Sequence, residues 1–373
     1  MGLSMPEATF VVHLDDFQGF VVKQKYPQSL TLNEKVLNLI FFEQQKEKKE
    51  NLTFSEIEGL KITIYSSPQY PGWMVCSMLG PDEVFEEVRS NISGSGRLIL
   101  ALISEDEDAV NLEELVTSGS VLKEKTEEQN LASIFLTPSA ALLLERMQAE
   151  GVEKAAKLSI WLKNQVQDEV DLREAMAPLM NSGVVKVELI GKTAETVFLV
   201  KDLFSYRAPP VESIMKVKQN HPSIDEKYRE FIAQFFSPPP PNKGYNPTIP
   251  VDDPNSPILE DREKISRLIA NSLNYMVLDT LRAEPLAISD ICEKTALPES
   301  IVQKVLWSLE SEKVVVNFEE ENVWALLTNP RIESFVPEYV LPLIAKKVSE
   351  KEITPQVARR HLELLLQNCG EEQ

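Results

Sequence analysis

The sequence predicts an α+β protein of several domains, and three observations support this prediction. The first third alternates short segments rich in β-branched residues with amphipathic segments. Two later regions share one order, in which helical segments precede a pair of apolar strands. Proline marks a boundary, because 11 of the 24 prolines lie between Arg207 and Leu259. A chain of 373 residues has room for two or three domains.

The first third predicts an antiparallel sheet with helices packed on it. Turn residues separate Ala8–Asp15 from Phe20–Tyr26, which favours a hairpin, and Thr31–Lys48 has the spacing of a helix. We expect further strands at Leu60–Tyr65, Trp73–Leu79 and Arg97–Ser104, and helices at Asp82–Arg89 and Asn111–Leu122. Gly94–Gly96 is interpreted as a turn before the last strand.

The two later regions each predict a winged helix, which is a set of three helices followed by a β-hairpin. The first has helices at Ser139–Gln148, Val152–Asn164 and Val170–Asn181, and strands at Val184–Ile190 and Thr196–Val200. The second has helices at Arg262–Leu281, Ser289–Thr295 and Pro298–Leu309, and strands at Lys313–Phe318 and Asn322–Leu327. Two more helices, Glu338–Val348 and Thr354–Gln367, close the chain. The two regions form a structural repeat of weak sequence identity.

These elements predict four segments, with bounds at 1–136, 137–206, 207–258 and 259–373. The third segment contains a helix at Ser223–Phe236, whose aromatic face we expect to be docked. It also contains Ser237–Pro257, which we interpret as an extended and mobile linker because of its prolines. We therefore expect the two halves of the chain to be separable.

Charge argues against nucleic acid as a partner. The chain has 38 Lys and Arg against 58 Asp and Glu, a net charge of −20. The third helix of the second region offers Gln303 and Lys304, but Glu299 accompanies them and Glu319–Glu321 forms its wing. The first region has Arg173 and Lys192 among several acidic residues. Acidic wings repel phosphates, so we interpret both winged helices as protein-interaction modules.

Residues that could carry chemistry are scattered. The chain has three cysteines and three histidines without ligand spacing, and no P-loop, GxSxG or HExxH motif. His13, Asp15, Asp16 and Cys76 are interpreted as structural residues. We therefore predict a non-enzyme without catalytic residues, metal or cofactor. We see no signal peptide and no apolar run long enough to span a membrane, which predicts a cytoplasmic protein.

Two groups of aromatic residues are candidate partner-binding residues. Tyr70-Pro71-Gly72-Trp73 places two large rings around a turn between strands. The rings either pack under the edge of the sheet or are presented to a partner, for which Tyr and Trp are suitable anchors. Phe41 and Phe42 lie on adjoining faces of the first helix, which gives it more apolar surface than one sheet face needs.

Three segments resemble a known family. Asp15–Pro27 resembles the first hairpin of longin domains in the nitrogen permease regulator 2-like family, with an acidic residue and Phe before a turn that contains Gly, and Tyr-Pro at the end of the second strand. Tyr70–Gly80 resembles that family's loop and the following strand, which ends in Leu-Gly. Winged helices follow the longin domain in that family. Met180–Val185 resembles the family's helix-to-wing junction.

The resemblance implies a scaffold or regulator that acts on Ras-like or Rag-like small GTPases and pairs with a second longin protein. From the open sheet edges and the apolar surface of the first helix, we expect the domain to pair with another longin or roadblock-type domain, as a homodimer or heterodimer. The family's loop carries an arginine finger, but Gly72 stands at the corresponding position and has no guanidinium to stabilise γ-phosphate charge. Arg89 and Arg97 are the nearest other arginines, and neither is assigned this role.

The leading hypothesis is a non-enzymatic scaffold or regulatory subunit that binds a small GTPase through a longin domain. Two alternatives stay open: a winged-helix transcription regulator with an N-terminal sensor domain, and a GTPase-activating subunit. We expect contact with membranes only through partners.

Overall fold

The computed structural model describes residues 6–15, 19–46, 52–67, 70–105, 110–118, 122, 124–166, 170–191, 194–241, 243–250, 253 and 256–369. The fold is α+β, as predicted. The chain divides into two compact units: Met1–Glu124 with Ile288–Val305, and Lys125–Ala287 with Leu306–Gln373. We call the elements before Lys125 the N-terminal domain and the elements from Lys125 onward, Ile288–Val305 included, the C-terminal body.

The N-terminal domain is a five-stranded antiparallel sheet in the order β2-β1-β5-β4-β3. Along the chain its elements are β1 (Ala8–Asp15), β2 (Gly19–Tyr26), α1 (Glu34–Lys46), β3 (Leu52–Ile57), β4 (Leu60–Ser66), β5 (Trp73–Leu79), α2 (Phe85–Glu105) and α3 (Leu112–Ser118). Four of the five predicted strands are confirmed. The turn residues Asp16–Gln18 lie outside the described residues.

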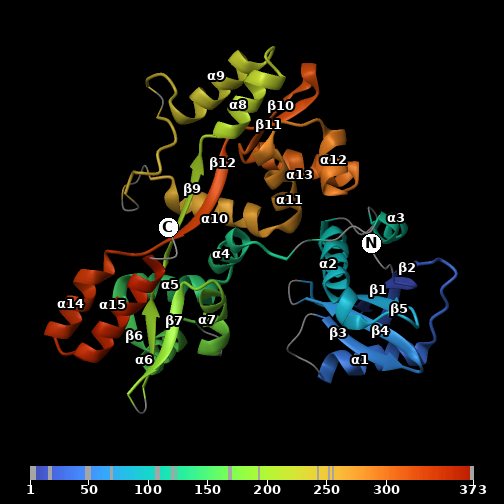
Figure 1. Cartoon of the computed structure of the whole chain (residues 1–373), viewed down its shortest axis with the longest axis horizontal. Coiled ribbons are helices and arrows are strands. Elements are labelled where there is room, and N and C mark those ends of the chain that lie inside the picture. The colour runs from blue at the N-terminus through green and yellow to red at the C-terminus, as the bar shows by residue number, and fades with distance from the viewer. Residues whose placement is uncertain are drawn as a thin grey trace. The chain divides into compact units, whose positions relative to one another are not determined.

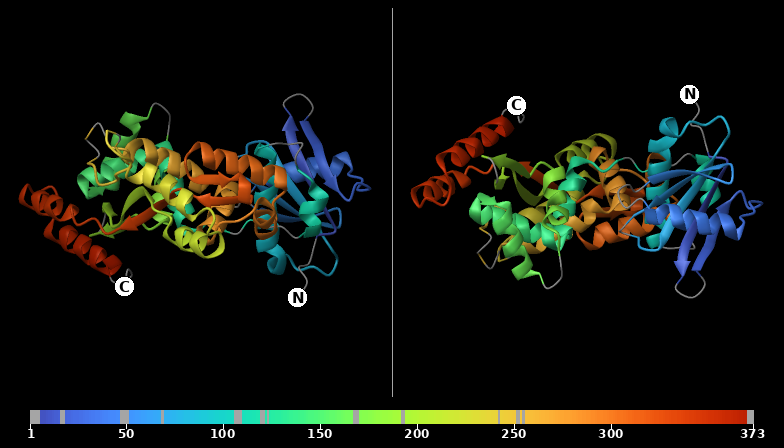
Figure 2. Two further views of the ribbon diagram at one scale, coloured as in Figure 1. Left: turned by 90° about the horizontal axis from the view of Figure 1, so that it is seen from above. Right: turned by 90° about the horizontal axis from the view of Figure 1, so that it is seen from below.

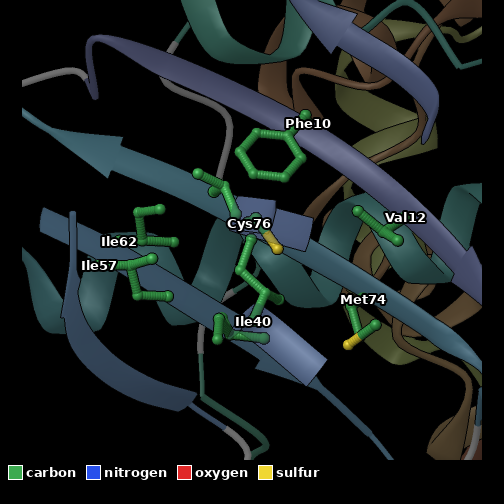
Figure 3. Packing of buried hydrophobic residues seen from close by; sticks show 9 residues of the cluster. Phe10, Val12, Ile40, Ile57, Ile62, Met74 and Cys76 are labelled. Carbon is green, nitrogen blue, oxygen red and sulfur yellow. The ribbon is translucent and has the colours of Figure 1, made fainter. Parts of the chain in front are cut away.

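Helices α1 and α2 cover opposite faces of this sheet (Figure 1). Side chains alternate between the faces of a strand, and Phe10 and Val12 of β1 therefore point the same way. They join Val36 and Ile40 of α1 and Cys76 of β5 in one buried cluster (Figure 3). This cluster is the core of the domain on its α1 side.

The prediction of a strand at Arg97–Ser104 is wrong, because these residues belong to α2. Gly94–Gly96, predicted as a turn, is helical. A Cβ atom on Gly96 would lie 2.6 Å from the ring of Tyr65 in β4. Glycine thus lets the helix approach the sheet closely, and that contact offsets its low helix propensity. The fifth strand is β3, which the sequence analysis missed because LTFSEI has many polar residues.

The C-terminal body contains two repeats that we define by their elements. The first repeat has α4 (Glu127–Leu136), α5 (Pro138–Glu150), β6 (Val152–Lys154), α6 (Ala155–Gln165), α7 (Leu172–Asn181), β7 (Val185–Ile190), β8 (Ala194–Leu199), β9 (Asp202–Ala208), α8 (Val211–Asn220) and α9 (Asp225–Phe236). The second repeat has α10 (Ile258–Ala270), α11 (Ser272–Ala283), α12 (Ile288–Thr295), α13 (Glu299–Ser311), β10 (Val315–Phe318), β11 (Val323–Leu326), β12 (Asn329–Phe335), α14 (Val340–Ser349) and α15 (Pro355–Cys369).

Each repeat has the element order expected of a winged helix. In the first, β6, β8 and β7 form a three-stranded sheet, and β6 was not predicted. In the second, β10 pairs with β11, and Leu286 forms an isolated bridge with Trp324 in the place of a first strand. The long helix predicted at Arg262–Leu281 is two helices, because the side chain of Asn271 accepts backbone hydrogen bonds and caps α11.

Matching backbone hydrogen bonds confirm the structural repeat. The amide of Val184 donates to Leu179 and that of Val314 to Leu309, at the junction between the third helix and the hairpin. The residue before each of these amides has a positive φ angle: 71° at Gly183 and 57° at Lys313. The helix therefore ends in the same left-handed turn in both repeats.

The two repeats exchange their last elements. Strands β9 and β12 run antiparallel with Ser205 opposite Ile332, and the chain of each repeat passes along this ribbon to the hairpin of the other (Figure 1). Helices α8 and α9 pack on β10 and β11. Helices α14 and α15 lie beside the hairpin of the first repeat, and α15 packs on β6 and β8 (Figures 1 and 2).

Two buried ion pairs also join the repeats. Arg207 of β9 donates hydrogen bonds of 2.7–2.9 Å to the carboxylate of Asp261 in α10. Arg282 of α11 donates to both carboxylate oxygens of Glu128 in α4, at 2.7 and 3.0 Å. Such bidentate contacts fix geometry as well as charge, so the repeats form one intertwined body.

The proline-rich segment is attached to this body at Tyr245. The amide of Tyr245 donates to Phe235 at 3.0 Å, and its hydroxyl accepts from the amide of Arg207 at 3.1 Å. Tyr245 therefore contacts the C-terminal body directly, and the mobility of the segment stays a prediction. The docked aromatic face of Ser223–Phe236 is confirmed, with Tyr228 fully buried.

Candidate partner-binding site

Backbone hydrogen bonds hold Tyr70–Trp73, which lies between β4 and β5. Pro68 and Gln69 lie outside the described residues. The amide of Tyr70 donates to Ser67 at 3.0 Å, and the amide of Trp73 donates to Tyr70 at 3.2 Å. The carbonyl of Gly72 accepts from the amide of Leu14 at 2.8 Å, which attaches the loop to β1. Gly72 has a φ angle of 82°, a region that glycine adopts without strain. These contacts hold Tyr70–Trp73 as a turn attached to β1.

Trp73 is half-buried in a cross-strand pair with His13. Their ring centroids are 4.3 Å apart and tilted by 37°. The ammonium of Lys23 in β2 lies 6.0 Å from the centre of the Trp73 ring, near the limit for a cation–π contact. The ring therefore packs on its own domain and still exposes part of its surface to solvent.

Tyr70 is also half-buried and turns toward the end of α2. Burial raises the pKa of its hydroxyl, while a hydrogen bond with Ser104 lowers it and the charge of Glu105 raises it. Between the two rings, Pro71 and Gly72 are exposed. Both rings thus pack in part on the domain, and the turn and part of Trp73 stay exposed. Presentation of this turn to a partner stays a prediction.

The second pair of candidate residues lies apart from this loop in the sequence, on α1. Phe42 is 59% exposed. The side chain of Phe41 lies outside the described part of the structure. Val36 and Ile40 of the same helix are buried in the core. Phe42 therefore lies on the outer surface of α1.

Gly72 stands where the family has its arginine, and this position is unsuited to a longer side chain. A Cβ atom on Gly72 would have ordinary contacts of 3.6 Å with His13 and Leu14, but its positive φ angle strains any side chain there. Arg97 donates to the carbonyl of Leu122 at 3.0 Å, and Arg89 pairs with Glu86 at 3.8 Å. Both lie in α2 and hold structural contacts.

Cys76 is fully buried in the core, as predicted. Burial raises the pKa of its thiol well above the ordinary value, and a neutral buried thiol is a poor nucleophile. His13 packs against Trp73, and Asp15 lies opposite Gly19 at the end of the β1–β2 hairpin. Asp16 lies outside the described residues. Within the described chain, no group of three or more His, Cys, Asp or Glu residues is placed to hold a metal ion.

Several exposed positions of the two repeats are acidic or apolar. Glu319–Glu321 forms an exposed turn between β10 and β11. On α13, Gln303 donates to Glu299 at 3.0 Å, and Trp307 is 60% exposed. Arg173 of α7 lies 3.7 Å from Glu195 of β8, and Lys192 lies outside the described residues.

The sequence analysis missed Lys23 and Trp307 as surface residues. The polar run Lys23–Lys25 in the predicted strand was a usable signal. Lys23 lies at a break in the β1–β2 register, where strict alternation does not hold. Helical spacing from Val302, Val305, Leu306 and Leu309, all buried, likewise puts Trp307 on the outer face. None of the helices in the described ranges is long and apolar enough to cross a membrane.

Comparison with known proteins finds no family model, no curated protein and no solved structure that matches this chain.

Proposed function

We propose that this protein is a non-enzymatic scaffold that binds a small GTPase of the Ras or Rag class through the β4–β5 loop of a longin-type domain. The observation that carries the proposal is the partial exposure of the Trp73 side chain. Its ring packs on His13 and lies next to the exposed Pro71 and Gly72 in the chain. A partly exposed aromatic ring on a fixed turn can bind a partner with little loss of conformational entropy.

The C-terminal body supports the scaffold role. Its repeats are joined by the β9–β12 ribbon and by the buried pairs Arg207–Asp261 and Arg282–Glu128. These connections hold the two repeats in a fixed arrangement, so the outer surfaces of the repeats keep a constant distance from each other. Its exposed acidic wing, Glu319–Glu321, favours protein partners over nucleic acid.

Phe42 supports a second partner on α1. A phenylalanine that is 59% exposed on a helix over the sheet is suited to an apolar interface. We propose a second longin or roadblock-type domain as the partner there. In this proposal the protein acts in the cytoplasm and reaches membranes only through its partners.

The test measures binding of purified Ras-class and Rag-class GTPases, loaded with GDP or a GTP analogue, to the full chain. Trp73→Ala should weaken binding by about 2 kcal/mol, roughly 30-fold, as truncation of an interface hot spot does. Trp307→Ala is the matched control, because it removes an exposed tryptophan elsewhere. Thermal unfolding of each variant corrects for stability.

Two results would contradict the proposal. One is failure of every GTPase to bind the wild type, and the other is unchanged affinity of Trp73→Ala per folded molecule. Hydrolysis of GTP should continue at the intrinsic rate when the protein is added, because Gly72 supplies no guanidinium.

A further inference from the structure

The β9–β12 ribbon of the C-terminal body has one buried face and one face toward solvent. The buried side chains of its two strands are Leu203, Ser205, Arg207, Pro330 and Ile332. Side chains alternate between the faces of a strand. The residues on the other face are Phe204, Tyr206, Arg331, Glu333 and Phe335, all of them more exposed. We call these five residues the outer ribbon face.

The outer ribbon face is rich in aromatic residues. Phe204 is 36% exposed and Phe335 is 37% exposed. The rings of Phe204 and Tyr206 stack, with their centroids 5.1 Å apart and their planes at 25°. Polar residues normally occupy the solvent side of an antiparallel sheet. Three aromatic residues at this position indicate a surface that a partner covers.

Arg331 and Glu333 are the two charged residues of this face. The register of the ribbon places Arg331 opposite Tyr206 and Glu333 opposite Phe204. Burial raises the pKa of Tyr206, the charge of Glu333 raises it further, and the charge of Arg331 lowers it. Both charges therefore lie close to the aromatic side chains. In the described chain, no ion pair involves Arg331 or Glu333.

The outer ribbon face is complementary to itself. One level of the ribbon has Tyr206 beside Arg331, and the other level has Phe204 beside Glu333. A twofold axis in the plane of the contact, at right angles to the strands, exchanges the two levels between two copies. Arg331 of each copy then faces Glu333 of the other copy, and Phe204 faces Tyr206. Sheets stack about 10 Å apart, a distance that these long side chains bridge.

We propose that the outer ribbon face joins two copies of this chain face to face about such an axis. Self-complementarity favours a second copy over an unrelated protein, because one surface supplies both halves of every contact. The proposal is independent of the GTPase proposal, since neither Tyr70–Trp73 nor Phe42 takes part in this contact. Five residues from each copy form a small interface, so we expect a dissociation constant in the micromolar range.

Sedimentation velocity of the full chain, over about 1–200 μM, measures this association. Arg331→Glu and Glu333→Arg each place like charges against each other in both charge contacts of the dimer. Each variant alone should raise the dissociation constant about tenfold or more. The two side chains lie on the solvent face, so the thermal unfolding of both variants should stay close to that of the wild type.

Arg173→Glu is the matched control for net charge. It changes the charge of the chain by the same amount as Arg331→Glu, at a side chain of α7 that is 82% exposed. This variant should associate as the wild type does. Equal weakening by Arg173→Glu and Arg331→Glu would mean that net charge, and not a contact at the ribbon, controls association, and would overturn the proposal.

A mixture of the two ribbon variants gives the sharpest test. The Arg331→Glu copy has glutamate at both positions, and the Glu333→Arg copy has arginine at both. The twofold contact places opposite charges together only in the mixed pair. An equimolar mixture should therefore associate at least as tightly as the wild type, although neither variant does so alone. Association of the ribbon with an unrelated protein would give no such rescue.

Three results would overturn the proposal: a wild type that stays monomeric over this range, single ribbon variants that associate as well as the wild type, or a mixture without rescue. Phe42→Ala and Trp73→Ala should leave association unchanged, which separates this result from the tests of the other two partner sites. Loss of association in Phe42→Ala, with the ribbon variants unaffected, would place the dimer contact on α1 and would also overturn the proposal.

Discussion

Tyr228 and His361 make equivalent hydrogen bonds in the two repeats of the C-terminal body. The Tyr228 hydroxyl in α9 donates to the carbonyl of Leu326 in β11 at 2.6 Å. Nε2 of His361 in α15 donates to the carbonyl of Leu199 in β8 at 2.7 Å. Both side chains are fully buried, and each reaches the hairpin of the other repeat. Each of these residues therefore joins an exchanged helix to the hairpin of the other repeat.

Tyr228→Phe should lower the free energy of unfolding of the C-terminal body by about 1–3 kcal/mol, because it leaves the buried carbonyl of Leu326 without this donor. Ser213, whose Oγ lies 2.8 Å from the same hydroxyl, loses that contact as well. Denaturant unfolding followed by tryptophan fluorescence measures the change. Ser213→Ala is the control, because it removes only the contact with Ser213, keeps the bond to Leu326 and should cost less. Equal losses in the two variants would contradict this account.

His361 should make the stability of the C-terminal body depend on pH. Burial lowers the pKa of its imidazole below the ordinary value, and the charge of Lys347 lowers it further, against the hydrogen bond to Leu199 that raises it. The folded state thus favours the neutral ring. Its contribution is complete above the unfolded pKa of about 6.5 and is lost as pH falls below it.

The difference in unfolding free energy between wild type and His361→Gln isolates this effect. This difference should shrink as pH is lowered from 7.5 to 5.5, because only the wild type loses the contribution of the neutral His361 ring. Carboxylates such as Glu153 and Glu188 titrate in both proteins, so their effects cancel. A difference that stays constant over this range would show that His361 does not titrate on unfolding.

Gly96→Ala should destabilise the N-terminal domain by about 1–3 kcal/mol, as overpacking does. The added Cβ would lie 2.6 Å from the Tyr65 ring, and this overlap outweighs the gain of about 1 kcal/mol in helix propensity. Thermal unfolding measures the loss. Ser90→Ala, at an exposed position of the same helix, should be neutral or stabilising. A more stable Gly96→Ala variant would refute the close approach of α2 to β4.

Proteolysis within Ser237–Pro257 should cut the chain and leave its two parts together. The sequence alone suggested separable halves, but the β9–β12 ribbon and the exchanged helices hold the repeats to each other. Size-exclusion chromatography of the cut protein in native buffer should give one peak, and denaturing gels two bands. Separation of the fragments in native buffer would contradict the exchange.

The chain should not bind duplex DNA with sub-micromolar affinity at physiological salt. Its net charge is −20, and the exposed Glu319–Glu321 turn repels phosphates. Titration of random and genomic duplexes at several salt concentrations tests this. Tight binding with a steep salt dependence would instead favour the transcription-regulator alternative.

Local patterns determined most of the elements. The β-branched residues of Ala8–Asp15 and the apolar run Trp73–Leu79 identified β1 and β5, and capping at Thr354 identified the start of α15. The order of helices and hairpins also indicated the repeat. In the Tyr70–Trp73 segment, the sequence identified the turn around Gly72. These features depend on residues close together in the chain, and the sequence pattern contains that information.

Tertiary contacts decided the rest. Residues 97–104 form a helix because Gly96 lets α2 pack on Tyr65, a contact with a residue far away in the sequence. The same holds for the exchange of elements, which depends on β9 pairing with β12 and on the contacts of Tyr228 and His361. Trp73 is half-buried because His13, on another strand, lies under its ring. Burial and pairing between distant segments depend on the assembled fold, and no local pattern encodes them.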